Sequence, residues 1–178
     1  MEKNILISGF GGQGMIKLGK ILAEAALSGY RHISWFPSYG AEMRGGTAHC
    51  SVKVSDQPIS SPFFSLSDIA VIFNQPSLDK FKNHFNQDAI VILNSDLIQA
   101  HSLGLKGNAS FYSFPLNEIA LRCGNIKVAN SVALGAILAL TDKFIRREDI
   151  ILALKKNFPE KDKYRQNLKA LREGEKLC

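Results

Sequence analysis

Gly9-Phe10-Gly11-Gly12-Gln13-Gly14 follows the short apolar run Ile5-Leu6-Ile7 and opens a segment whose apolar residues have helical spacing. Met15, Leu18 and Leu22 recur at three- and four-residue steps, and polar residues fall mostly between them. This period is typical of an amphipathic helix with one buried side. The stretch therefore predicts a strand, a glycine turn and a helix, which together form the first unit of an α/β fold.

The glycine turn has the composition of an anion-binding loop. Gly9, Gly11 and Gly14 match the G-x-G-x-x-G spacing of dinucleotide sites, with Gly12 and Gln13 between them. Glycine lets a ligand approach the backbone, and the start of a helix presents unpaired N–H groups at the positive end of its dipole. Tight packing of the helix on the strand explains the same glycines equally well, so both interpretations stay open.

A nicotinamide site is a secondary possibility because one of its parts is missing. Such sites have an acidic residue near the end of the second strand, about 20 residues beyond the glycines, which binds the ribose hydroxyls. Here the second predicted strand, residues 32–36, runs into Pro37-Ser38-Tyr39-Gly40. The nearest carboxylate, Glu42, lies beyond that turn.

The rest of the chain alternates between strand and helix patterns. Short apolar or alternating runs predict strands, a Pro-Ser pair predicts a helix start, and the apolar run after Asn130-Ser131 predicts a buried helix. These elements are strands at 32–36, 47–54, 69–73, 89–93 and 110–114, and helices at 76–83 and 132–140. Residues 55–58 have the composition of a hairpin-like turn, and residues 97–108 that of a surface connection.

The expected fold is α/β: a single Rossmann-like domain over residues 1–178, with a mixed central sheet flanked by helices. Residues 143–178 carry 11 Lys and Arg against 6 Asp and Glu, and their apolar residues keep a helical period. We expect them to form a basic helical appendage that faces solvent, an acidic partner subunit or a phosphate-bearing ligand. The interleaved acidic residues argue against a nucleic-acid partner.

Length and composition limit the class of protein further. The 178-residue chain is long enough for one domain with a sizeable core. Its first apolar run is too short for a signal peptide and no later run approaches membrane-spanning length, so we expect a cytoplasmic protein with no membrane partner. Cys50, Cys123 and Cys178 are far apart and the four histidines are dispersed. We therefore expect no metal on this chain and assign no catalytic residue.

The connection after the second predicted strand has the most unusual chemistry in the chain. It reads Pro37-Ser38-Tyr39-Gly40-Ala41-Glu42-Met43-Arg44-Gly45-Gly46-Thr47. Arg44 can clamp a carboxylate or phosphate through two parallel hydrogen bonds, and Gly45 and Gly46 allow close approach to the backbone. A Glu42–Arg44 ion pair that only holds the loop together is the alternative.

These motifs resemble the gamma subunit of 2-oxoacid:ferredoxin oxidoreductases, especially the 2-oxoglutarate type, and the equivalent pyruvate/ketoisovalerate oxidoreductase domain. The resemblance rests on the glycine turn and on the stretch from Pro37 to Gly46. It is supported by Asn74-Gln75-Pro76-Ser77-Leu78 and by Asn130-Ser131-Val132-Ala133-Leu134-Gly135-Ala136, so that it covers residues 5–140 in order.

The resemblance implies a component of an enzyme that decarboxylates a 2-oxoacid, forms an acyl-CoA and sends electrons to ferredoxin. In such complexes thiamine diphosphate and Mg²⁺ belong to the alpha and beta subunits, and the [4Fe–4S] clusters to beta or a delta subunit. The isolated gamma chain is then inactive, with coenzyme A as a co-substrate of the complex.

The same resemblance implies a division of roles among the candidate residues. Gly9, Gly11, Gly12, Gln13, Gly14, Arg44, Gly45 and Gly46 are the candidates for holding the coenzyme A phosphates, and Ser38, Tyr39, Glu42, Asn74 and Asn130 for substrate or subunit contacts. Three alternatives stay open: a purely structural subunit, a free-standing nucleotide-binding protein, and a gamma subunit for pyruvate, 2-oxoisovalerate or indolepyruvate. Apolar surface meant for partners would favour a homodimer of the isolated chain.

Overall fold

The computed structural model describes residues 2–38, 47–99, 109–141 and 144–177. The first half of the fold contains β1 (Glu2–Gly9), α1 (Met15–Ala26), β2 (His32–Ser38), β3 (Ala48–Ser55), β4 (Ser67–Ile72), α2 (Gln75–Phe81) and β5 (Phe85–Asn94). The second half contains β6 (Ser110–Phe114), α3 (Leu116–Arg122), the 3-10 turn η3 (Ile126–Val128), α4 (Ala129–Leu140), α5 (Arg147–Asn157) and α6 (Lys161–Glu175). No helix within these described ranges is both long and apolar enough to cross a membrane.

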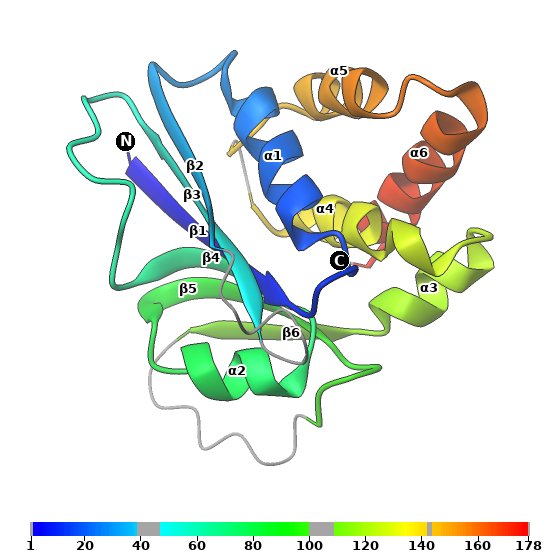
Figure 1. Ribbon diagram of the computed structural model, residues 1–178, viewed down its shortest axis with the longest axis horizontal. Helices are drawn as coiled ribbons and strands as arrows, with labels where there is room; N and C mark the ends of the chain where they lie inside the picture. The colour runs from blue at the N-terminus through cyan, green and yellow to red at the C-terminus, as the bar shows by residue number, and fades with distance from the viewer. Residues whose placement is uncertain (1, 39–46, 100–108, 142–143, 178) are drawn as a thin grey trace.

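The central sheet has six strands in the order β2-β3-β1-β4-β5-β6 (Figure 1). Strands β1, β4, β5 and β6 are parallel, whereas β3 is antiparallel to both β1 and β2. The predicted mixed α/β sheet is therefore confirmed. Its order departs from that of a doubly wound dinucleotide domain, because an antiparallel strand lies between β1 and β2.

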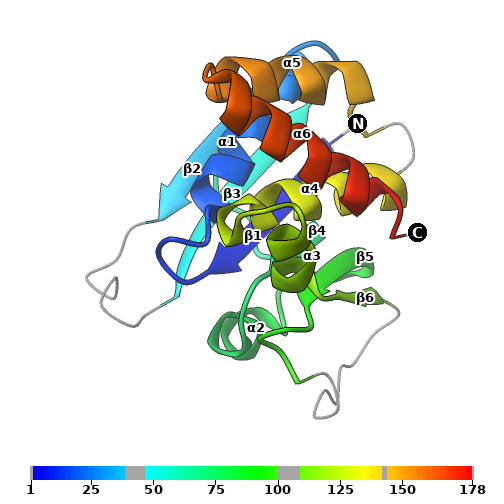
Figure 2. The same ribbon diagram turned by 90° about the vertical axis from the view of Figure 1, so that its right-hand side faces the viewer.

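Helices cover the two faces of the sheet unequally. α1, α3, α4, α5 and α6 lie on one face, and α2 lies on the other (Figures 1 and 2). Successive residues of a strand point to opposite faces, so Ile5 and Ile7 enter the core under the larger helical layer. Leu6 and Ala70 enter the smaller core that includes Phe81 of α2.

Most of the predicted elements are present, with one wrong connection. The strands predicted at 32–36, 47–54, 69–73, 89–93 and 110–114 and the helices at 76–83 and 132–140 match β2, β3, β4, β5, β6, α2 and α4. The hairpin-like turn predicted at 55–58 is wrong, because β3 and β4 do not pair and β1 lies between them. Turn-forming residues show where a strand ends but not which strand it pairs with. Residues 100–108 of the predicted surface connection lie outside the described residues.

The C-terminal helices are part of the core rather than the expected appendage. Ala170 and Leu171 of α6 are fully buried in the same cluster as Val132 and Leu134 of α4. A buried hydrogen bond from Ser131 Oγ to Asn167 Oδ1, 2.6 Å long, joins the two helices. The polar composition of the tail concealed this contact, because only a narrow stripe of α6 is apolar.

The layer between α1 and the sheet is packed tightly around Cys50. This thiol is fully buried on β3 and donates a 3.4 Å hydrogen bond to the carbonyl oxygen of Met15. A methyl group placed on Gly19 would lie 2.5 Å from Cys50 Sγ, so α1 approaches the sheet closely only because residue 19 has no side chain. Burial raises the pKa of the Cys50 thiol to about 12.

This buried thiol is expected to make the protein lose stability in alkali. The ordinary pKa is 9.0, so above pH 9 the unfolded chain releases the proton while the folded chain keeps it. The free energy of unfolding should then fall by about 1.4 kcal/mol per pH unit, a loss that continues toward the folded pKa. Urea denaturation of the wild type and Cys50→Ala at several values from pH 8 upward measures this. Parallel loss in both proteins would contradict the assignment to Cys50.

Candidate anion-binding site at the carboxyl edge of the sheet

The described residues among those singled out in the sequence meet at one edge of the sheet. The parallel strands β1 and β4 both end there, and the register pairs Gly9 with Ala48 at the start of β3 and Ser38 with His49. The chain therefore leaves β1 and β2, and enters β3, at the same edge (Figure 1). The connection from β1 leads to α1 on one face, and that from β4 leads to α2 on the other. Such a switch between two adjacent strands is where open α/β sheets bind their ligands.

The side chain of Gln13 holds the glycine turn in shape from within. Gln13 Oε1 accepts a 2.6 Å hydrogen bond from the backbone N–H of Phe10, which closes the turn on itself. The same oxygen accepts a 3.3 Å hydrogen bond from Nδ2 of Asn74. Asn74 is buried, and its Oδ1 also accepts from the N–H of Ser77 to cap α2. One network therefore fixes the glycine turn relative to the start of α2.

A second asparagine fixes the turn from the opposite side. Gly14 precedes α1 with φ 77°, a left-handed conformation that residues with a side chain rarely adopt. Asn130, buried in the first turn of α4, donates from Nδ2 to the carbonyl oxygen of Gly14 at 3.3 Å. A methyl group on Gly14 would lie 2.7 Å from that nitrogen. The turn therefore needs glycine here both for its backbone angle and for the contact with α4.

The N-terminus of α1 is available to an anion. Among the residues that the structure describes, no side chain caps this helix, and its first turn holds no acidic residue. Its first N–H groups consequently have no acceptor within the helix and point out of its positive end. Gly11 and Gly12 are exposed, and a methyl group on either would meet no atom of the described residues within 4 Å. Open space thus adjoins the backbone of the turn.

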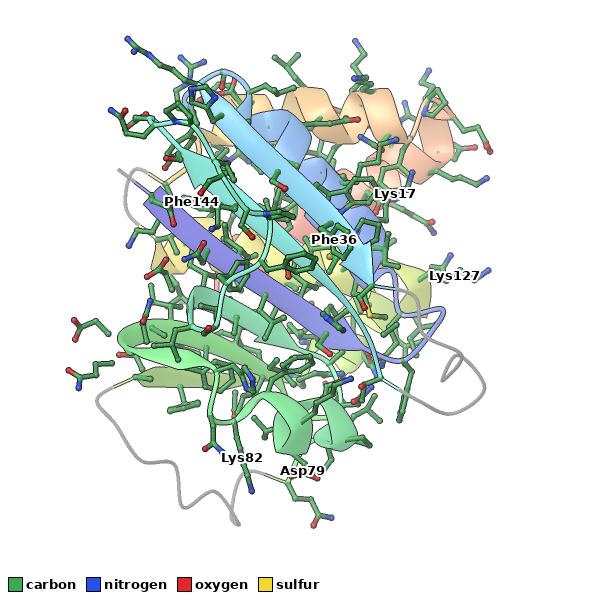
Figure 3. The ribbon with its side chains drawn as sticks, turned by 60° about the vertical axis from the view of Figure 1, so that its left-hand side comes forward. Lys17, Phe36, Asp79, Lys82, Lys127 and Phe144 are labelled. Atoms are coloured by element: carbon green, nitrogen blue, oxygen red, sulfur yellow. The ribbon has the colours of Figure 1, made fainter. Side chains whose placement is uncertain are left out.

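Two lysines lie at the same end of the sheet as the glycine turn (Figure 3). Lys17, in the first turn of α1, is half-buried and donates a 3.3 Å hydrogen bond to Asn157 Oδ1. Its Nζ also lies 5.4 Å from the centre of the Phe158 ring. Lys127 is exposed in η3, just before α4. Both add positive charge at this end of the sheet (Figure 3), although the ammonium group of Lys17 is held by Asn157 and Phe158.

The structure describes only part of the predicted site. Gly9, Gly11, Gly12, Gln13, Gly14, Asn74 and Asn130 form one connected group, and Ser38 ends β2 at the same edge. Tyr39, Glu42, Arg44, Gly45 and Gly46 lie outside the described residues. Asn74 and Asn130 are both buried and both hold the turn through hydrogen bonds. Their contact with substrate or with another subunit stays a prediction.

Sequence reasoning missed a polar group at the end of β5. Asn94 is fully buried, its Nδ2 donates to the carbonyl oxygen of Phe73, and its Oδ1 accepts from the N–H of Leu116. Asp96 caps the unpredicted helix α3 by accepting from the N–H of Asn117 at 2.7 Å. The sequence signal was the polar run Asn94-Ser95-Asp96 directly after an apolar strand, which marks the strand end, whereas its contact with the distant start of α3 has no local signal.

The sheet order explains why the acidic residue of a nicotinamide site is missing. In such sites the second strand lies next to the first, so its terminal carboxylate is close to the glycine turn. Here β3 occupies that position, and β2 is one strand farther away. The described residues also contain no group of three His, Cys, Asp or Glu side chains placed to hold a metal ion.

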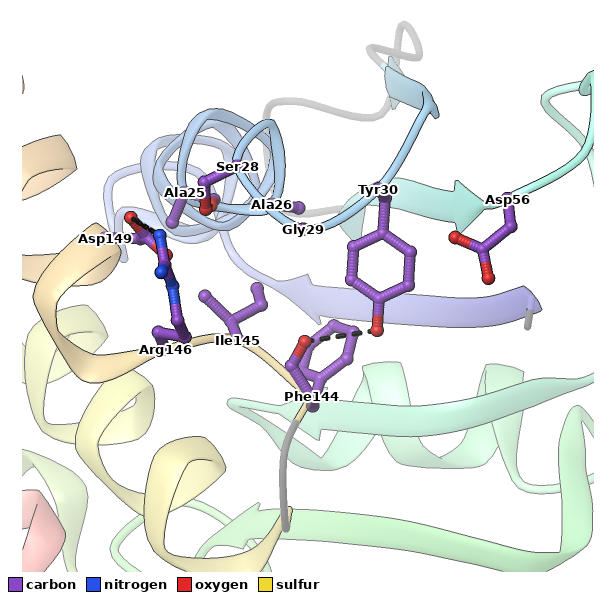
Figure 4. A pocket seen from close by; sticks show the side chains of 10 residues that line it. All are labelled: Ala25, Ala26, Ser28, Gly29, Tyr30, Asp56, Phe144, Ile145, Arg146 and Asp149. Carbon is purple, nitrogen blue, oxygen red and sulfur yellow. Dashed lines mark hydrogen bonds and ion pairs between the residues drawn. The ribbon is translucent and has the colours of Figure 1, made fainter.

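A hollow of about 350 Å³ lies at the other end of α1 (Figure 4). Tyr30 lies on one side, where its hydroxyl donates a 3.1 Å hydrogen bond to the carbonyl oxygen of Phe144. On the other side Arg146 and Asp149 form a two-point ion pair with distances of 2.7 and 3.1 Å. Burial, and then the charge of Asp56, raise the pKa of Tyr30. No residue of the candidate site lines this hollow.

A glycine turn that opens an uncapped helix at the switch point of a mixed sheet defines the class: an α/β domain with the features of an anion-binding site. Comparison with known proteins narrows this class. The family described as "Pyruvate ferredoxin/flavodoxin oxidoreductase" matches residues 4–177. The chain belongs to this family, and its resemblance to the gamma subunits of 2-oxoacid:ferredoxin oxidoreductases is confirmed.

Two curated relatives match nearly the whole chain. The ketoisovalerate oxidoreductase subunit VorA of Methanothermobacter marburgensis is 38% identical over 174 residues, which are 97% of this chain and 36% of that protein. The 2-oxoglutarate synthase subunit KorC of Methanocaldococcus jannaschii is 35% identical over 178 residues, which are 98% of this chain and 92% of that protein. The chain therefore spans about a third of the length of the first and nearly all of the second.

Solved structures show the same fold. The gamma subunit of a keto/oxoacid ferredoxin oxidoreductase from Geobacter sulfurreducens superposes with a TM-score of 0.82 at 31% identity, over 97% of this chain and 95% of that one. The 2-oxoglutarate:ferredoxin oxidoreductase of Magnetococcus marinus superposes with a TM-score of 0.87 at 22% identity, over 99% of this chain but 31% of that one. The second likeness establishes the fold alone.

Proposed function

We propose that this chain is the gamma subunit, or gamma domain, of a 2-oxoacid:ferredoxin oxidoreductase, and that its glycine turn holds the phosphates of coenzyme A. The observation that carries the second part is the uncapped start of α1, with Gly11 and Gly12 exposed beside it. Backbone N–H groups at a helix N-terminus favour phosphate, and no carboxylate lies in the first turn to compete.

Our first choice of substrate is 2-oxoglutarate. The sequence from Ser38 to Gly46 suggested it, and the KorC relative, named as a 2-oxoglutarate synthase subunit, matches this chain over 92% of its length. A branched-chain 2-oxoacid is the second candidate, because VorA is named as a ketoisovalerate oxidoreductase subunit and is 38% identical. Pyruvate and indolepyruvate are further members of the same substrate class.

We propose that the redox groups of the complex lie on its other chains. Thiamine diphosphate with Mg²⁺ would be held by the alpha and beta subunits, and [4Fe–4S] clusters by the beta or delta subunit. Ferredoxin would then be reached through the complex rather than by this chain. The contribution of this chain is to bind and orient an anionic co-substrate, which needs backbone donors and positive charge rather than a metal.

Co-expression with the chains encoded beside it tests the subunit role. We expect a purified complex that reduces viologen in a CoA-dependent reaction, fastest with 2-oxoglutarate among 2-oxoglutarate, pyruvate and 2-oxoisovalerate. Highest activity with 2-oxoisovalerate would favour the second substrate. A chain that purifies alone and is instead stabilised against heat by a nucleotide would contradict the proposal, since a ligand that binds only the folded state raises its stability.

Gly11→Ala in that complex tests the role of the turn. Residue 11 has no left-handed backbone angle and open space around its missing side chain, so the free energy of unfolding should change by less than about 0.5 kcal/mol. The methyl group would project where an anion approaches the backbone, and we expect the KM for CoA to rise about fivefold to tenfold.

Gly29→Ala is the matched control for this variant. Gly29 also has open space around it, but it lies beyond the opposite end of α1. The KM for CoA should stay within about twofold of the wild type. An unchanged KM in Gly11→Ala, with the control also unchanged, would contradict phosphate binding at the turn while leaving the subunit role intact.

A further inference from the structure

Four basic side chains form a stripe along the outer side of α6. Arg165, Lys169, Arg172 and Lys176 follow one another at steps of four, three and four residues, which places them on one side of a helix. The opposite side of α6 carries the buried residues Asn167, Ala170, Leu171 and Gly174, which pack on α4. The stripe therefore points away from the core, on the face of the molecule that Figure 2 presents.

The stripe continues onto α3 and η3. Nζ of Lys169 donates a 3.3 Å hydrogen bond to the carbonyl oxygen of Arg122, which ends α3 and is itself exposed. Burial and the negative charge of Glu173 raise the pKa of the neighbouring Cys123 thiol, and the positive charges of Lys169, Arg122 and Lys176 oppose that rise. These cations therefore surround one point on the surface rather than spreading over the tail.

Much of this positive charge is not neutralised. Lys127, Lys169 and Arg172 form no ion pair with any residue that the structure describes. Arg165 pairs with Asp162 at 3.9 Å, Arg122 with Glu118 at 3.6 Å and Lys176 with Glu173 at 2.6 Å, and these exposed pairs are worth little in water. The face made by α3, η3 and the stripe consequently keeps a net positive charge.

Two large apolar side chains interrupt this basic face. Leu121 is 59% exposed and Ile126 is 49% exposed, and in the sequence they lie before and after Cys123. An apolar pair rimmed by charge is typical of a protein interface, whereas a nucleic-acid backbone gains little from exposed leucine and isoleucine. The arrangement favours a protein with an acidic surface as the occupant.

The basic face borders the candidate site. Ile126 and Lys127 lie in η3, directly before α4, and Asn130 of α4 holds Gly14 of the glycine turn. A protein bound to the stripe would extend past η3 toward the exposed glycines. Such a partner would cover the open side of the turn and help to enclose whatever binds there.

We propose that α6, α3 and η3 form a docking surface for an acidic face of a partner subunit, centred on Lys169, Arg172, Leu121 and Ile126. This inference rests on the proposed function, because it takes the partner from the other chains of the oxidoreductase. Opposite charges across the interface speed association and fix the orientation of the partner, and the apolar pair supplies desolvated contact. The sequence alone left open whether the basic tail faces solvent or a partner, and this proposal assigns it to a partner.

Charge reversal in the co-expressed complex tests the surface. The full chain, tagged and carrying Lys169→Glu and Arg172→Glu, is purified with its neighbours, and the ratio of bound partner subunits to tagged chain is measured at two salt concentrations. We expect at least about a fivefold lower ratio than in the wild type at about 0.1 M NaCl, where exposed charges are only partly screened. Lys169→Arg with Arg172→Lys should retain the wild-type ratio.

Lys82→Glu with Lys155→Glu is the matched control. It changes the net charge by the same amount, on α5 and beyond the end of α2, and both lysines are exposed. The control should assemble like the wild type. Equal losses in both charge-reversed proteins, or no loss in either, would overturn the docking surface while leaving the subunit role intact.

Further measurements distinguish a failure of the docking surface from a failure of the proposed subunit role. A wild-type chain that retains no partner subunit at any salt concentration would overturn the proposed function and the docking surface together. A labelled single-stranded DNA that binds the wild type but not the stripe variant, with partner retention unchanged, would assign the stripe to nucleic acid and overturn the inference. Loss of partner retention in Leu121→Asp with Ile126→Asp, but not in Leu27→Asp with Leu152→Asp, would support it.

Discussion

Gly135→Ala is expected to lower the free energy of unfolding by about 3 kcal/mol or more, because it forces two helix backbones apart. A methyl group on Gly135 of α4 would fall on the carbonyl oxygen of Leu171 in α6. One on Gly174 would fall on the carbonyl oxygen of Val132. Backbone atoms cannot rotate away as a side chain can, so the only relief is separation of α4 from α6. That separation would also stretch the buried Ser131–Asn167 hydrogen bond.

The direction of the change in unfolding free energy distinguishes a helix contact from helix propensity. Alanine inside a helix normally stabilises relative to glycine by about 1 kcal/mol, so a loss in Gly135→Ala must come from the helix contact. Urea denaturation of Gly135→Ala, Gly174→Ala and Gly29→Ala measures it, with the last as the control in open space. A stability gain in Gly135→Ala would show that α4 and α6 do not cross this closely.

The elements of the fold were predictable from sequence, but their neighbours were not. Helical spacing predicted α1, a Pro-Ser helix start predicted α2, and a continuous apolar run predicted α4. Alternation or apolar runs predicted every strand, because these patterns follow from which side of an element is buried. Alternation in β3 does not say that it pairs with β1 rather than β4, so the turn at 55–58 was misread. The seven-residue helix α3 is too short to show a helical period.

The tail was misjudged for a different reason. Its contact with α4 depends on the absence of side chains at Gly135 and Gly174 and on one buried amide, Asn167. Glycine and asparagine carry no hydrophobic signal, so the sequence made α6 look like a solvated helix. Patterns that count apolar residues miss a helix crossing made by backbone contact.

In the candidate site too, the local pattern was predictable from sequence and the long-range contacts were not. Gly9 to Gly14 were predicted because a glycine turn between a strand and a helix is a local pattern. The hydrogen bond between Asn74 and Gln13 joins residues 61 positions apart, and the one between Asn130 and Gly14 joins residues 116 apart. The sequence marked both asparagines as candidates for substrate or subunit contacts, but only the three-dimensional arrangement shows that each one holds the glycine turn.

Arg44 is expected to have the largest effect on function of any single residue in this chain. It belongs to the connection between Ser38 and Thr47, whose two ends lie at the edge of the sheet where the glycine turn also lies. A guanidinium group binds phosphate or carboxylate through two parallel, charge-assisted hydrogen bonds. We propose that Arg44 contributes this contact to the coenzyme A phosphates held over the turn.

Arg44→Ala in the assembled complex should raise the KM for CoA about 10- to 100-fold, the usual cost of losing a hydrogen bond to a charged group. Arg44→Lys keeps the charge but not the two-point geometry and should fall between this variant and the wild type. If Arg44 only pairs with Glu42 to hold the loop, Glu42→Gln should raise the KM equally, and the double variant should add nothing. An unchanged KM and turnover in Arg44→Ala would remove Arg44 from the binding site.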